Sequence, residues 1–313
     1  MAILDSIPEA IEVIRSGGVI IVVDDEDREN EGDFVTASRS VTPEIINFMA
    51  THGRGLICAP LIESRCDALG LGLMVQTNNA AYETPFTVSV DLLGNGCTTG
   101  ISASDRSKTI HALIDPDTDP NTLGKPGHIF PLRAKAGGVL RRNGHTEAAI
   151  DFARLAGFEP AGVIVEILNE DGTMARLPEL KKLAIKHDMK LVSIADLIAY
   201  RLENETLIER TVEVKLNTEY GSFTAISYRQ MTNDVEHLAL VKGKWKPSAA
   251  VPVRVHASSM IGDVFQVSDL GKGPQLQAAM SKIENLEYGA IVFINKLHQG
   301  GGFAAELKAY AEY

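Results

Sequence analysis

The sequence predicts an α+β protein in which a mixed-sheet domain is followed by a smaller α+β domain. Its 313 residues exceed what one hydrophobic core usually organises, and helical and strand patterns alternate in both parts. The net charge of −11 lies wholly in residues 1–210, whereas residues 211–313 hold ten basic and ten acidic residues. The charged stretch 203–205 lies between these two parts of the chain. We therefore expect one domain over residues 1–205 and another over residues 211–313.

Composition excludes several classes of protein. With 45% hydrophobic and 23% charged residues the chain is typical of globular proteins, and its acidic pI of about 5.2 argues against a nucleic-acid or anionic-membrane partner. No apolar run reaches the ~18 residues of a membrane helix. Asp5 and Glu9 lie where a leader would be basic or free of acids. Three cysteines without a CxxC pair favour a reducing compartment, so we expect a cytoplasmic protein with cysteines as apolar fillers.

The first domain begins with a helix and a buried strand. One helical face is formed by four apolar residues, namely Ile7, Ala10, Ile11 and Ile14. Gly17 and Gly18 end this helix. The apolar run 19–23 predicts a strand buried on both faces, and it leads directly into an acidic segment. Further strands are expected over residues 56–60, 86–90 and 162–168.

Capping residues locate the later helices of this domain. Thr42 is placed as an N-cap and Gly53 as a stop for the second helix. Other helices should begin near Ser104 and just after Gly144. Two more are expected over residues 178–187 and 194–203. The segment 115–127 is rich in Asp, Pro and Gly and is expected to form a loop.

The second domain opens with a hairpin. Residues 211–216 and 222–228 alternate with period two around a polar turn at residues 217–221. Three further strands are expected, over residues 235–241, 251–256 and 290–295. One amphipathic helix is predicted near residues 274–286. Its inward face consists of Leu276, Met280, Ile283 and Leu286.

The strongest chemical signal is the acidic segment 24–33, which holds seven acids and one arginine. It follows a buried strand directly, where sites of α/β-type proteins tend to lie. Carboxylates mixed with Arg28 and Gly32 suit a metal ion held together with an anion. The spacing does not fit an EF-hand, and hard oxygen ligands favour Mg²⁺ or Mn²⁺ over Zn²⁺. The alternative is a solvated acidic loop.

A second signal lies in residues 141–147, where two arginines and a glycine precede a helix start. Free backbone N–H groups and the helix dipole favour a phosphate at such a position. His145 within this segment could add a metal ligand. The alternative is an ordinary capped helix with surface arginines.

Two single residues complete the set. His128 lies between Pro126 and Pro131, which would make it rigid for a loop residue. Glu166 lies inside an apolar run, where a carboxylate is costly unless it is paired or functional. The glycine-rich stretch 94–100 matches neither nucleotide-binding pattern. From the residues alone we infer a metal-assisted enzyme that acts on a small phosphorylated substrate.

Four motifs together resemble 3,4-dihydroxy-2-butanone 4-phosphate synthase. They are residues 24–33, 98–106, 126–133 and 144–148, and the likeness runs over about residues 5–203 in the family's order and spacing. The resemblance implies a lyase of riboflavin biosynthesis that converts D-ribulose 5-phosphate into L-3,4-dihydroxy-2-butanone 4-phosphate and formate. It also implies two Mg²⁺ or Mn²⁺ ions per active site and a homodimer with its sites at the subunit interface.

The same resemblance assigns roles to residues that are present in this sequence. Glu29 and His145 would be metal ligands, and His128 and Glu166 would be essential to catalysis. The expected substrate contacts are Arg28, Glu29, Asp33, Arg142, Asn143, Gly144, His145, Thr146 and Glu166.

The C-terminal part is similar to GTP cyclohydrolase II over residues 252–256 and 261–265. That family binds Zn²⁺ through three cysteines, and the corresponding positions here are Ser259, Leu270 and Lys272. None of these side chains replaces a thiolate. Where the family continues Gln-Glu-Gly-Arg-Gly, this chain has residues 299–303 as Gln-Gly-Gly-Gly-Phe.

We therefore expect a degenerate domain, truncated to about half of a cyclohydrolase domain, with no zinc and no cyclohydrolase activity. It would be a regulatory or interaction module, with a flavin-pathway protein as its partner, or a passive remnant. Two alternatives stay open. One is a bifunctional enzyme with GTP cyclohydrolase II activity, and the other is a non-catalytic regulator of the flavin pathway.

Overall fold

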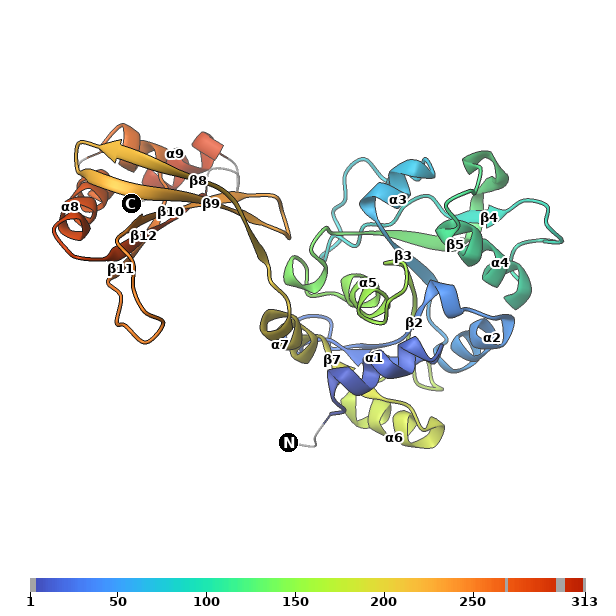
Figure 1. The fold of residues 1–313 in the computed structure, drawn as a ribbon. Coiled ribbons are helices and arrows are strands. Elements are labelled where there is room, and N and C mark those ends of the chain that lie inside the picture. The colour runs from blue at the N-terminus through green and yellow to red at the C-terminus, as the bar shows by residue number, and fades with distance from the viewer. Residues whose placement is uncertain (1–3, 268–269, 297–301, 312–313) are drawn as a thin grey trace. The chain divides into compact units, whose positions relative to one another are not determined.

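The computed structural model describes residues 4–267, 270–296 and 302–311 (Figure 1). The chain divides into two compact units, unit 1 with residues 1–205 and unit 2 with residues 206–313. Each unit has its own sheet. Within the described ranges, no helix combines the length and the apolar character that a membrane crossing requires.

A seven-stranded sheet in the order β4-β5-β3-β6-β2-β1-β7 forms the centre of unit 1. Its strands are β1 (Ile20–Val23), β2 (Gly32–Ala37), β3 (Cys58–Ile62), β4 (Val90–Leu92), β5 (Leu123–Ala134), β6 (Gly162–Glu166) and β7 (Leu191–Ser193). The β1/β7 and β3/β5 pairs are parallel, while the β1/β2, β2/β6, β3/β6 and β4/β5 pairs are antiparallel. The prediction of a mixed sheet is confirmed.

Helices cover both faces of this sheet (Figure 1). One apolar layer holds α1 (Ile7–Arg15), α5 (His145–Leu155) and α7 (Ile194–Asn204). The other holds α2 (Pro43–His52), α3 (Glu63–Ala68), α4 (Ala103–Ile114) and α6 (Leu177–His187). In β1, Ile20 and Val22 belong to the first layer, and Ile21 and Val23 to the second. This strand is therefore buried on both faces, as its continuous apolar run predicts.

The predicted N-cap of α2 at Thr42 and its stop at Gly53 are confirmed. The Thr42 hydroxyl accepts the N–H of Ile45, and Gly53 follows the last residue of α2. Ser193 caps α7 in the same way by accepting the N–H of Asp196. These short-range bonds satisfy backbone groups that a helix end leaves without partners, so they depend only on local sequence.

Three parts of unit 1 differ from the sequence-based expectation. The expected loop over residues 115–127 is wrong at its end, because β5 begins at Leu123. The expected strand over residues 86–90 is reduced to two isolated bridges before β4. β2 has no counterpart in the prediction because it begins inside the acidic segment. In each case pairing with strands that are distant in the sequence outweighs local composition.

Unit 2 contains a five-stranded sheet in the order β11-β12-β10-β9-β8. Its strands are β8 (Ile208–Thr218), β9 (Gly221–Gln230), β10 (Glu236–Lys242), β11 (Val253–Ala257) and β12 (Gly289–Ile294). Only the β11/β12 pair is parallel. The remaining elements are the π-helix η4 (Met260–Val264) and the helices α8 (Lys272–Glu284) and α9 (Gly302–Ala311).

Helix α8 packs on one face of this sheet. Met280 and Ile283 form a small core with sheet residues that include Phe223, Ala225 and Leu240. The predicted inward face is confirmed for Met280 and Ile283. It is wrong for Leu286, which lies beyond the end of α8 and is 36% exposed.

Candidate functional site

The acidic segment after β1 folds around one buried carboxylate. Asp24 Oδ1 accepts the N–H of Glu31 at 2.8 Å, and its Oδ2 accepts the N–H of Glu29 at 3.1 Å. Asp24 Oδ2 also accepts a hydrogen bond of 2.8 Å from Arg28 Nη1. The side chain of Asp24 is fully buried. These contacts hold Arg28 and Glu29 in defined positions, whereas Asp25 to Asp27 of the same segment are exposed to solvent.

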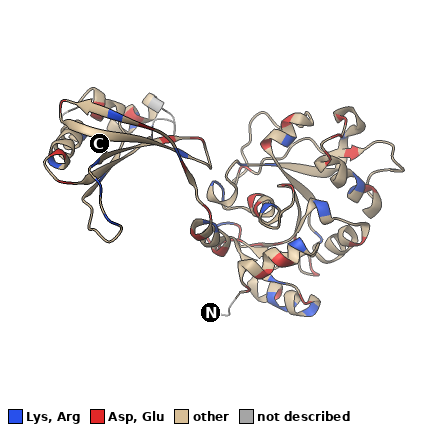
Figure 2. Cartoon of the chain, viewed as in Figure 1, with Lys and Arg blue, Asp and Glu red and all other residues tan. Residues whose placement is uncertain are grey.

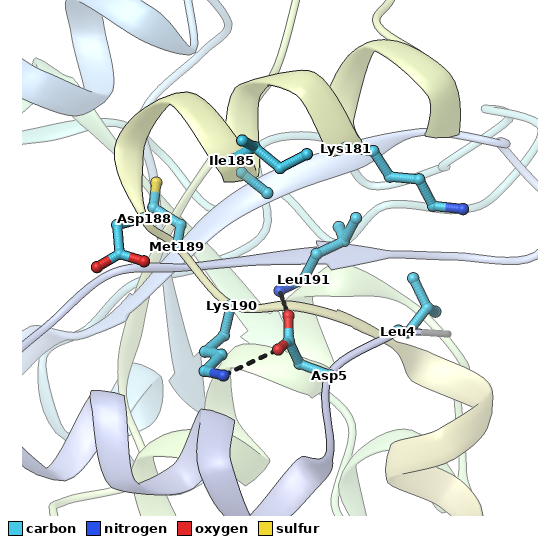
Figure 3. A pocket seen from close by; sticks show the side chains of 9 residues that line it. Leu4, Asp5, Lys181, Ile185, Asp188, Met189, Lys190 and Leu191 are labelled. Atoms are coloured by element: carbon cyan, nitrogen blue, oxygen red, sulfur yellow. Dashed lines mark hydrogen bonds and ion pairs between the residues drawn. The ribbon is translucent and has the colours of Figure 1, made fainter. Parts of the chain in front are cut away.

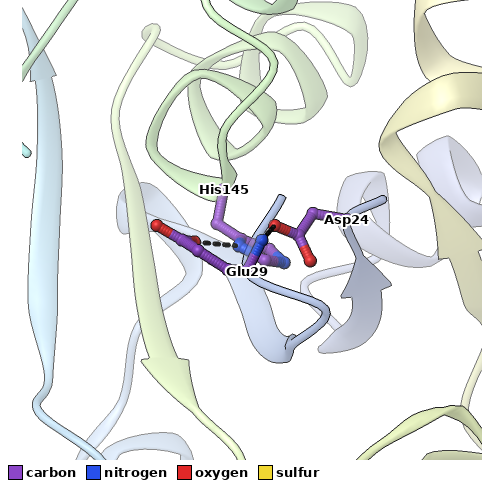
Figure 4. A group of neighbouring side chains, drawn as sticks. All are labelled: Asp24, Glu29 and His145. Atoms are coloured by element: carbon purple, nitrogen blue, oxygen red, sulfur yellow. Dashed lines mark hydrogen bonds and ion pairs between the residues drawn. The ribbon is translucent and has the colours of Figure 1, made fainter. Parts of the chain in front are cut away.

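Asp24, Glu29 and His145 lie together, with ligand atoms that are all within 4.8 Å of one another (Figure 4). His145 is the first residue of α5, and its Nε2 lies 3.1 Å from the carbonyl oxygen of Val22. This contact requires a proton on Nε2, so Nδ1 is the nitrogen that can bind a cation once its own proton is lost. Nδ1 lies 3.8 Å from Glu29 Oε2 and 4.0 Å from Asp33 Oδ1. A histidine that donates one ring N–H to a backbone carbonyl is oriented as metal-binding histidines usually are.

Asp33 is a buried carboxylate with an unsatisfied oxygen. Its Oδ1 has no hydrogen-bond partner among the described residues. In the sheet register Asp33 of β2 lies directly opposite Glu166 of β6, so two acids share one face. Burial, Glu166, Glu31 and Glu29 raise the pKa of Asp33 to about 7 despite the opposing effect of His145. Burial lowers the pKa of His145, but Asp33, Glu29 and Asp24 raise it more, to about 9.

The carboxylates differ in how many oxygen atoms remain free to bind a cation. Asp24 uses both oxygens to fold the loop, so it is the least available ligand of the group. Glu29 uses Oε2 in an ion pair of 2.6 Å with Arg28, and Asp33 keeps Oδ1 without a partner. Glu29, Asp33 and His145 Nδ1 are therefore the donor set that fits a divalent cation, and its hard oxygens suit Mg²⁺ or Mn²⁺.

Glu166 reaches the same place from the end of β6. It is the last residue of that strand and is half-buried, so the expected mid-strand position is wrong. Its Oε2 accepts the N–H of Leu56 at 2.8 Å. A Cβ on Gly55 would lie 2.4 Å from this oxygen and 2.6 Å from the Glu166 carbonyl oxygen. Only a glycine lets the chain pass this close to Glu166.

The start of α5 offers a site for an anion. Gly144 is the N-cap of this helix, and as a glycine it brings no side chain to the free N–H groups. A Cβ at Gly144 would lie 2.4 Å from Arg142 Nη1 and 3.1 Å from Arg28 Nη2. Buried Glu147 holds Arg142 through a bond of 2.8 Å, and the Arg28 guanidinium lies 5.2 Å from the centre of the Tyr82 ring. Two guanidinium groups and a helix N-terminus therefore converge, which suits a phosphate.

These groups line one cavity of about 100 Å³. Its lining consists of Arg28, Glu29, Glu31, Asp33, Cys58, Thr84, Phe86, Leu132, Arg142, His145, Thr146, Ile164 and Glu166. Seven of the sequence-predicted site residues are in this set. Charged residues of both signs occur throughout the chain (Figure 2), and this cavity gathers side chains of both signs at one place in unit 1.

Sequence reasoning missed other members of the site. Asp24 and Glu31 lie in the acidic segment, which is the signal that could have identified them. Thr84 and Phe86 carry no local signal. The interpretation of Cys58 as a simple filler is wrong in part, because it lines the cavity beside Glu166. Burial raises the pKa of its thiol, as do Glu166 and Asp33 to a smaller degree.

Three predicted residues are not part of this lining, namely Gly144, which is the N-cap of α5, His128 and Asn143. His128 belongs to β5, so it is a strand residue and not part of a rigid loop. Its Nδ1 lies 2.6 Å from Asp91 Oδ2, its N–H donates to Asp91 Oδ1, and its side chain is 44% exposed. Leu132 of the same strand does line the cavity, but four residues of strand separate it from His128 by about 13 Å. Asn143 is exposed and does not line the cavity.

A larger hollow of about 500 Å³ lies between α6 and β7 (Figure 3). Part of its polar lining is paired, because the Asp5 carboxylate accepts the N–H of Leu191 and pairs with Lys190. The rest of its lining includes Leu4, Ile185 and Met189. We assign this hollow a structural role at the edge of the sheet.

In unit 2, the positions expected to correspond to zinc ligands serve local structure. The Ser259 hydroxyl accepts the N–H of Gly262 at 3.1 Å and caps η4, and Lys272 begins α8. Asp263 accepts the N–H of Ser259 and lies 2.9 Å from His256 Nε2. Among the residues described in this unit, no three metal-ligating side chains converge. The predicted departure at Gln299, Gly300 and Gly301 lies outside the described residues.

Comparison with known families places the two units in different groups. Residues 8–200 match the 3,4-dihydroxy-2-butanone 4-phosphate synthase family, and residues 209–313 match the GTP cyclohydrolase II family. The riboflavin biosynthesis protein RibBA of Cytophaga hutchinsonii is 62% identical over 98% of this chain and 76% of the relative. RibBA of Parabacteroides distasonis is 54% identical over the same shares.

Two solved structures are also similar. One is RibBX, a two-domain 3,4-dihydroxy-2-butanone 4-phosphate synthase from A. baumannii. It is 43% identical with a TM-score of 0.74, over 98% of this chain and 86% of that chain. The other is a 3,4-dihydroxy-2-butanone 4-phosphate synthase in complex with two magnesium ions. It is 42% identical with a TM-score of 0.62, over 64% of this chain and 98% of that chain.

Proposed function

This chain belongs to the 3,4-dihydroxy-2-butanone 4-phosphate synthase family, and from that premise we propose which residues of unit 1 carry the synthase reaction. The substrate is D-ribulose 5-phosphate, and the products are L-3,4-dihydroxy-2-butanone 4-phosphate and formate. One observation supports the proposal above all others. Carboxylates with His145 and the first turn of α5 line the same cavity.

The residues present fit Mg²⁺ or Mn²⁺. The unsatisfied Oδ1 of Asp33 and Nδ1 of His145 face each other at 4.0 Å, with Glu29 beside them. Glu29 and His145 would hold the cation, with Asp33 as a further oxygen ligand. A bound divalent cation would polarise the ketone oxygen of the substrate and so acidify the neighbouring carbon.

The protein groups bind, orient and move protons. Arg142, Arg28 and the first N–H groups of α5 would hold the substrate phosphate, with Thr146 beside them, and this fixes the sugar relative to the carboxylates. Glu166 uses Oε2 for the N–H of Leu56, so Oε1 is the atom that can accept or return a proton. Hydrophobic side chains such as Phe86 and Ile164 line the cavity and reduce the access of water.

Purified full-length protein should release formate from D-ribulose 5-phosphate when Mg²⁺ is added. We expect Glu166→Gln to abolish this release and a chelator to stop it reversibly. Glu170→Gln is the matched control, because the Glu170 side chain is 94% exposed and lies outside the cavity. Formate release that survives in Glu166→Gln would contradict the assigned role of Glu166.

The position of His128 bears on assembly. It points to Asp91 on the β4 side of the sheet, away from the cavity of its own chain. We infer a homodimer in which His128 of a second copy completes the site. Asp91 would hold the ring with Nδ1 as the paired nitrogen and Nε2 facing outward.

A mixing experiment tests this arrangement. Glu166→Gln and His128→Ala homodimers should both be inactive, whereas their hybrid dimer contains one site with both native residues. Equal mixing followed by subunit exchange should restore about a quarter of the wild-type activity, because half of the dimers are hybrids with one working site of two. If the two residues act within one chain, mixing restores nothing.

For unit 2 we infer a domain that has lost the cyclohydrolase reaction and serves regulation or interaction. Ser259, Leu270 and Lys272 offer no thiolate, and Ser259 is already used as a cap. Its partner would be a protein of the flavin pathway. The match of residues 209–313 to the GTP cyclohydrolase II family favours the second candidate, a bifunctional enzyme.

Metal analysis and turnover separate these two functions of unit 2. We expect no stoichiometric zinc in the purified chain and no formate from GTP, measured apart from the reaction with D-ribulose 5-phosphate. Zinc at one equivalent per chain, together with GTP turnover, would establish the bifunctional enzyme instead.

A further inference from the structure

Strand β8 is an exposed edge of the sheet in unit 2. It is the terminal strand of that sheet, it spans eleven residues, and ten of them are exposed. Such a strand carries a row of backbone N–H and C=O groups that can pair with another strand. Proteins usually protect long edges by shortening, covering or twisting them. Here a bulge between Arg210 and Glu213 interrupts the first part, while Glu213 to Thr218 pair regularly with β9.

The apolar face beneath α8 continues onto this edge. Val214 lies opposite Ala225, and Leu216 lies opposite Phe223. Ala225 and Phe223 belong to the core that α8 covers. Residues directly opposite each other share a face, so Val214 and Leu216 extend this core to the edge of the sheet. They are nevertheless 52% and 38% exposed, which leaves the apolar face open where β8 ends it.

We propose that β8 pairs antiparallel with β8 of a second copy of this chain, with the two-fold axis at Val214. A two-fold axis perpendicular to a continuous sheet brings each residue opposite one on the same face. The axis must therefore pass through a residue and not between two residues. This condition leaves only a few registers to compare.

Charge decides among these registers. With the axis at Val214, Glu213 lies opposite Lys215 of the partner strand, and symmetry forms this pair twice. An axis at Glu213 or at Lys215 would instead place like charges opposite each other, which is unfavourable. An axis at Leu216 leaves Glu213 and Lys215 without an opposite charge directly across. An axis at Val212 would set Lys215 opposite Glu209, but it would centre the pairing on the bulge between Arg210 and Glu213, where the strand is irregular. Of the registers centred on the regular stretch 213–218, the one at Val214 sets Glu213 opposite Lys215.

The charged residues of this edge are free to make these pairs. Lys215 is exposed and forms no ion pair within the described parts of the chain, and Glu213 is paired only with Arg210 of its own strand. At the same register the two Val214 side chains meet at the axis, so the apolar faces of the two sheets are in contact there. This interface is independent of the synthase site and of the homodimer inferred from His128.

A cysteine at the axis tests the pairing in the full-length chain. Residues opposite each other in an antiparallel pair have Cα atoms about 4.5–5.5 Å apart, within reach of a disulfide. Val214→Cys should therefore cross-link to a covalent dimer under mild oxidation, seen on a non-reducing gel and reversed by a reductant. Glu219→Cys is the matched control, because two copies of this exposed residue would be about 33 Å apart. Absence of the Val214→Cys dimer, or equal cross-linking in Glu219→Cys, overturns the proposal.

Charge reversal in the Val214→Cys background tests the register. Recovery of cross-linking in the double variant also shows that a loss in the single variants is not due to misfolding. Glu213→Lys and Lys215→Glu each create two like-charge pairs, and each should raise the dissociation constant of the pairing about tenfold. The double variant Glu213→Lys/Lys215→Glu restores opposite charges in reversed order, so its cross-linking should return to the starting level. If the double variant cross-links no better than the single ones, this register is wrong.

Discussion

Asp33 of unit 1, which is buried, and Asp263 of unit 2, which is partly buried, differ in what surrounds their carboxylates. In unit 1, Asp33 is buried opposite Glu166, and its Oδ1 has no partner among the described residues. In unit 2, Asp263 is fully engaged, with one oxygen on His256 and the other on the N–H of Ser259. An unpaired buried acid is costly unless a cation or a proton compensates it, whereas a paired acid needs nothing further. The comparison indicates that unit 1 is built to receive a ligand and that this part of unit 2 is built for stability.

Replacing the histidine beside each carboxylate should give the largest difference between the two units. His145→Ala removes the nitrogen that faces Glu29 and Asp33, and we expect formate release to fall on the order of 10²–10³-fold. His256→Ala removes the corresponding histidine of unit 2 and should leave the synthase rate unchanged. Steady-state kinetics with D-ribulose 5-phosphate measure both. A similar loss in the two variants would show that the units are coupled.

A methyl group at the helix N-terminus should have a smaller effect. Gly144→Ala places a Cβ where Arg142 Nη1 now lies, so the guanidinium must move away from the phosphate position. We expect KM to rise about tenfold with a modest change in kcat, because binding is lost more than chemistry. Gly72→Ala is the control, since its Cβ would meet nothing within 4 Å. An unchanged KM in Gly144→Ala would remove Arg142 from substrate binding.

Stability should respond to pH and Mg²⁺ in unit 1 alone. Folding raises the pKa of Asp33 to about 7 and that of His145 to about 9, so the folded unit holds more protons than the unfolded chain. Without a cation, stability should therefore fall as the pH rises through 7 and 9. Mg²⁺ must displace these protons, so it should bind more tightly at pH 8.5 than at pH 6.

Calorimetry of the full-length chain measures this dependence. At a Mg²⁺ concentration of 100 times its dissociation constant, the gain in the free energy of unfolding is about 2.7 kcal/mol. We expect the transition of unit 1 to shift upward more at pH 8.5 than at pH 6, and that of unit 2 to stay in place. Equal shifts at both pH values would contradict the assignment of Asp33 and His145 as the groups that titrate.

The smallest expected effects are changes in stability when Asp33 or Asp263 is replaced by asparagine. Above pH 9 and without Mg²⁺, where Asp33 is ionised and His145 is neutral, Asp33→Asn removes one of two like charges, so it should stabilise unit 1 by about 1 kcal/mol while impairing the reaction. Asp263→Asn weakens a charged hydrogen bond to buried His256 and should destabilise unit 2 by about 1–3 kcal/mol. Two melting transitions that shift in opposite directions would support the comparison. Destabilisation of unit 1 by Asp33→Asn would refute it.

Much of the site could be predicted because its parts are local in the sequence. Residues 24–33 and 141–147 each contain charged groups within one short segment, and both lie in the observed site. Thr84 and Phe86 could not be predicted, since nothing near them in the sequence marks them as cavity residues. The absence of His128 from the cavity lining could not be predicted either, because it depends on where β5 runs through the sheet.

The sequence by itself determined the features that depend on neighbouring residues. These include the helix caps at Thr42 and Ser193, the strand buried on both faces after Gly18, and the chemistry of the two charged segments. Such features need only contacts a few residues apart, so local pattern is sufficient.

Only the tertiary structure decided which of these groups meet. The register that sets Asp33 opposite Glu166, the bond from His145 to the Val22 carbonyl and the open edge at β8 all join or separate distant segments. Strand register and helix packing are set by burial of the whole core and not by any one segment. This is why the sequence predicted the ligands of the site, while the fold determined which acid kept an oxygen free.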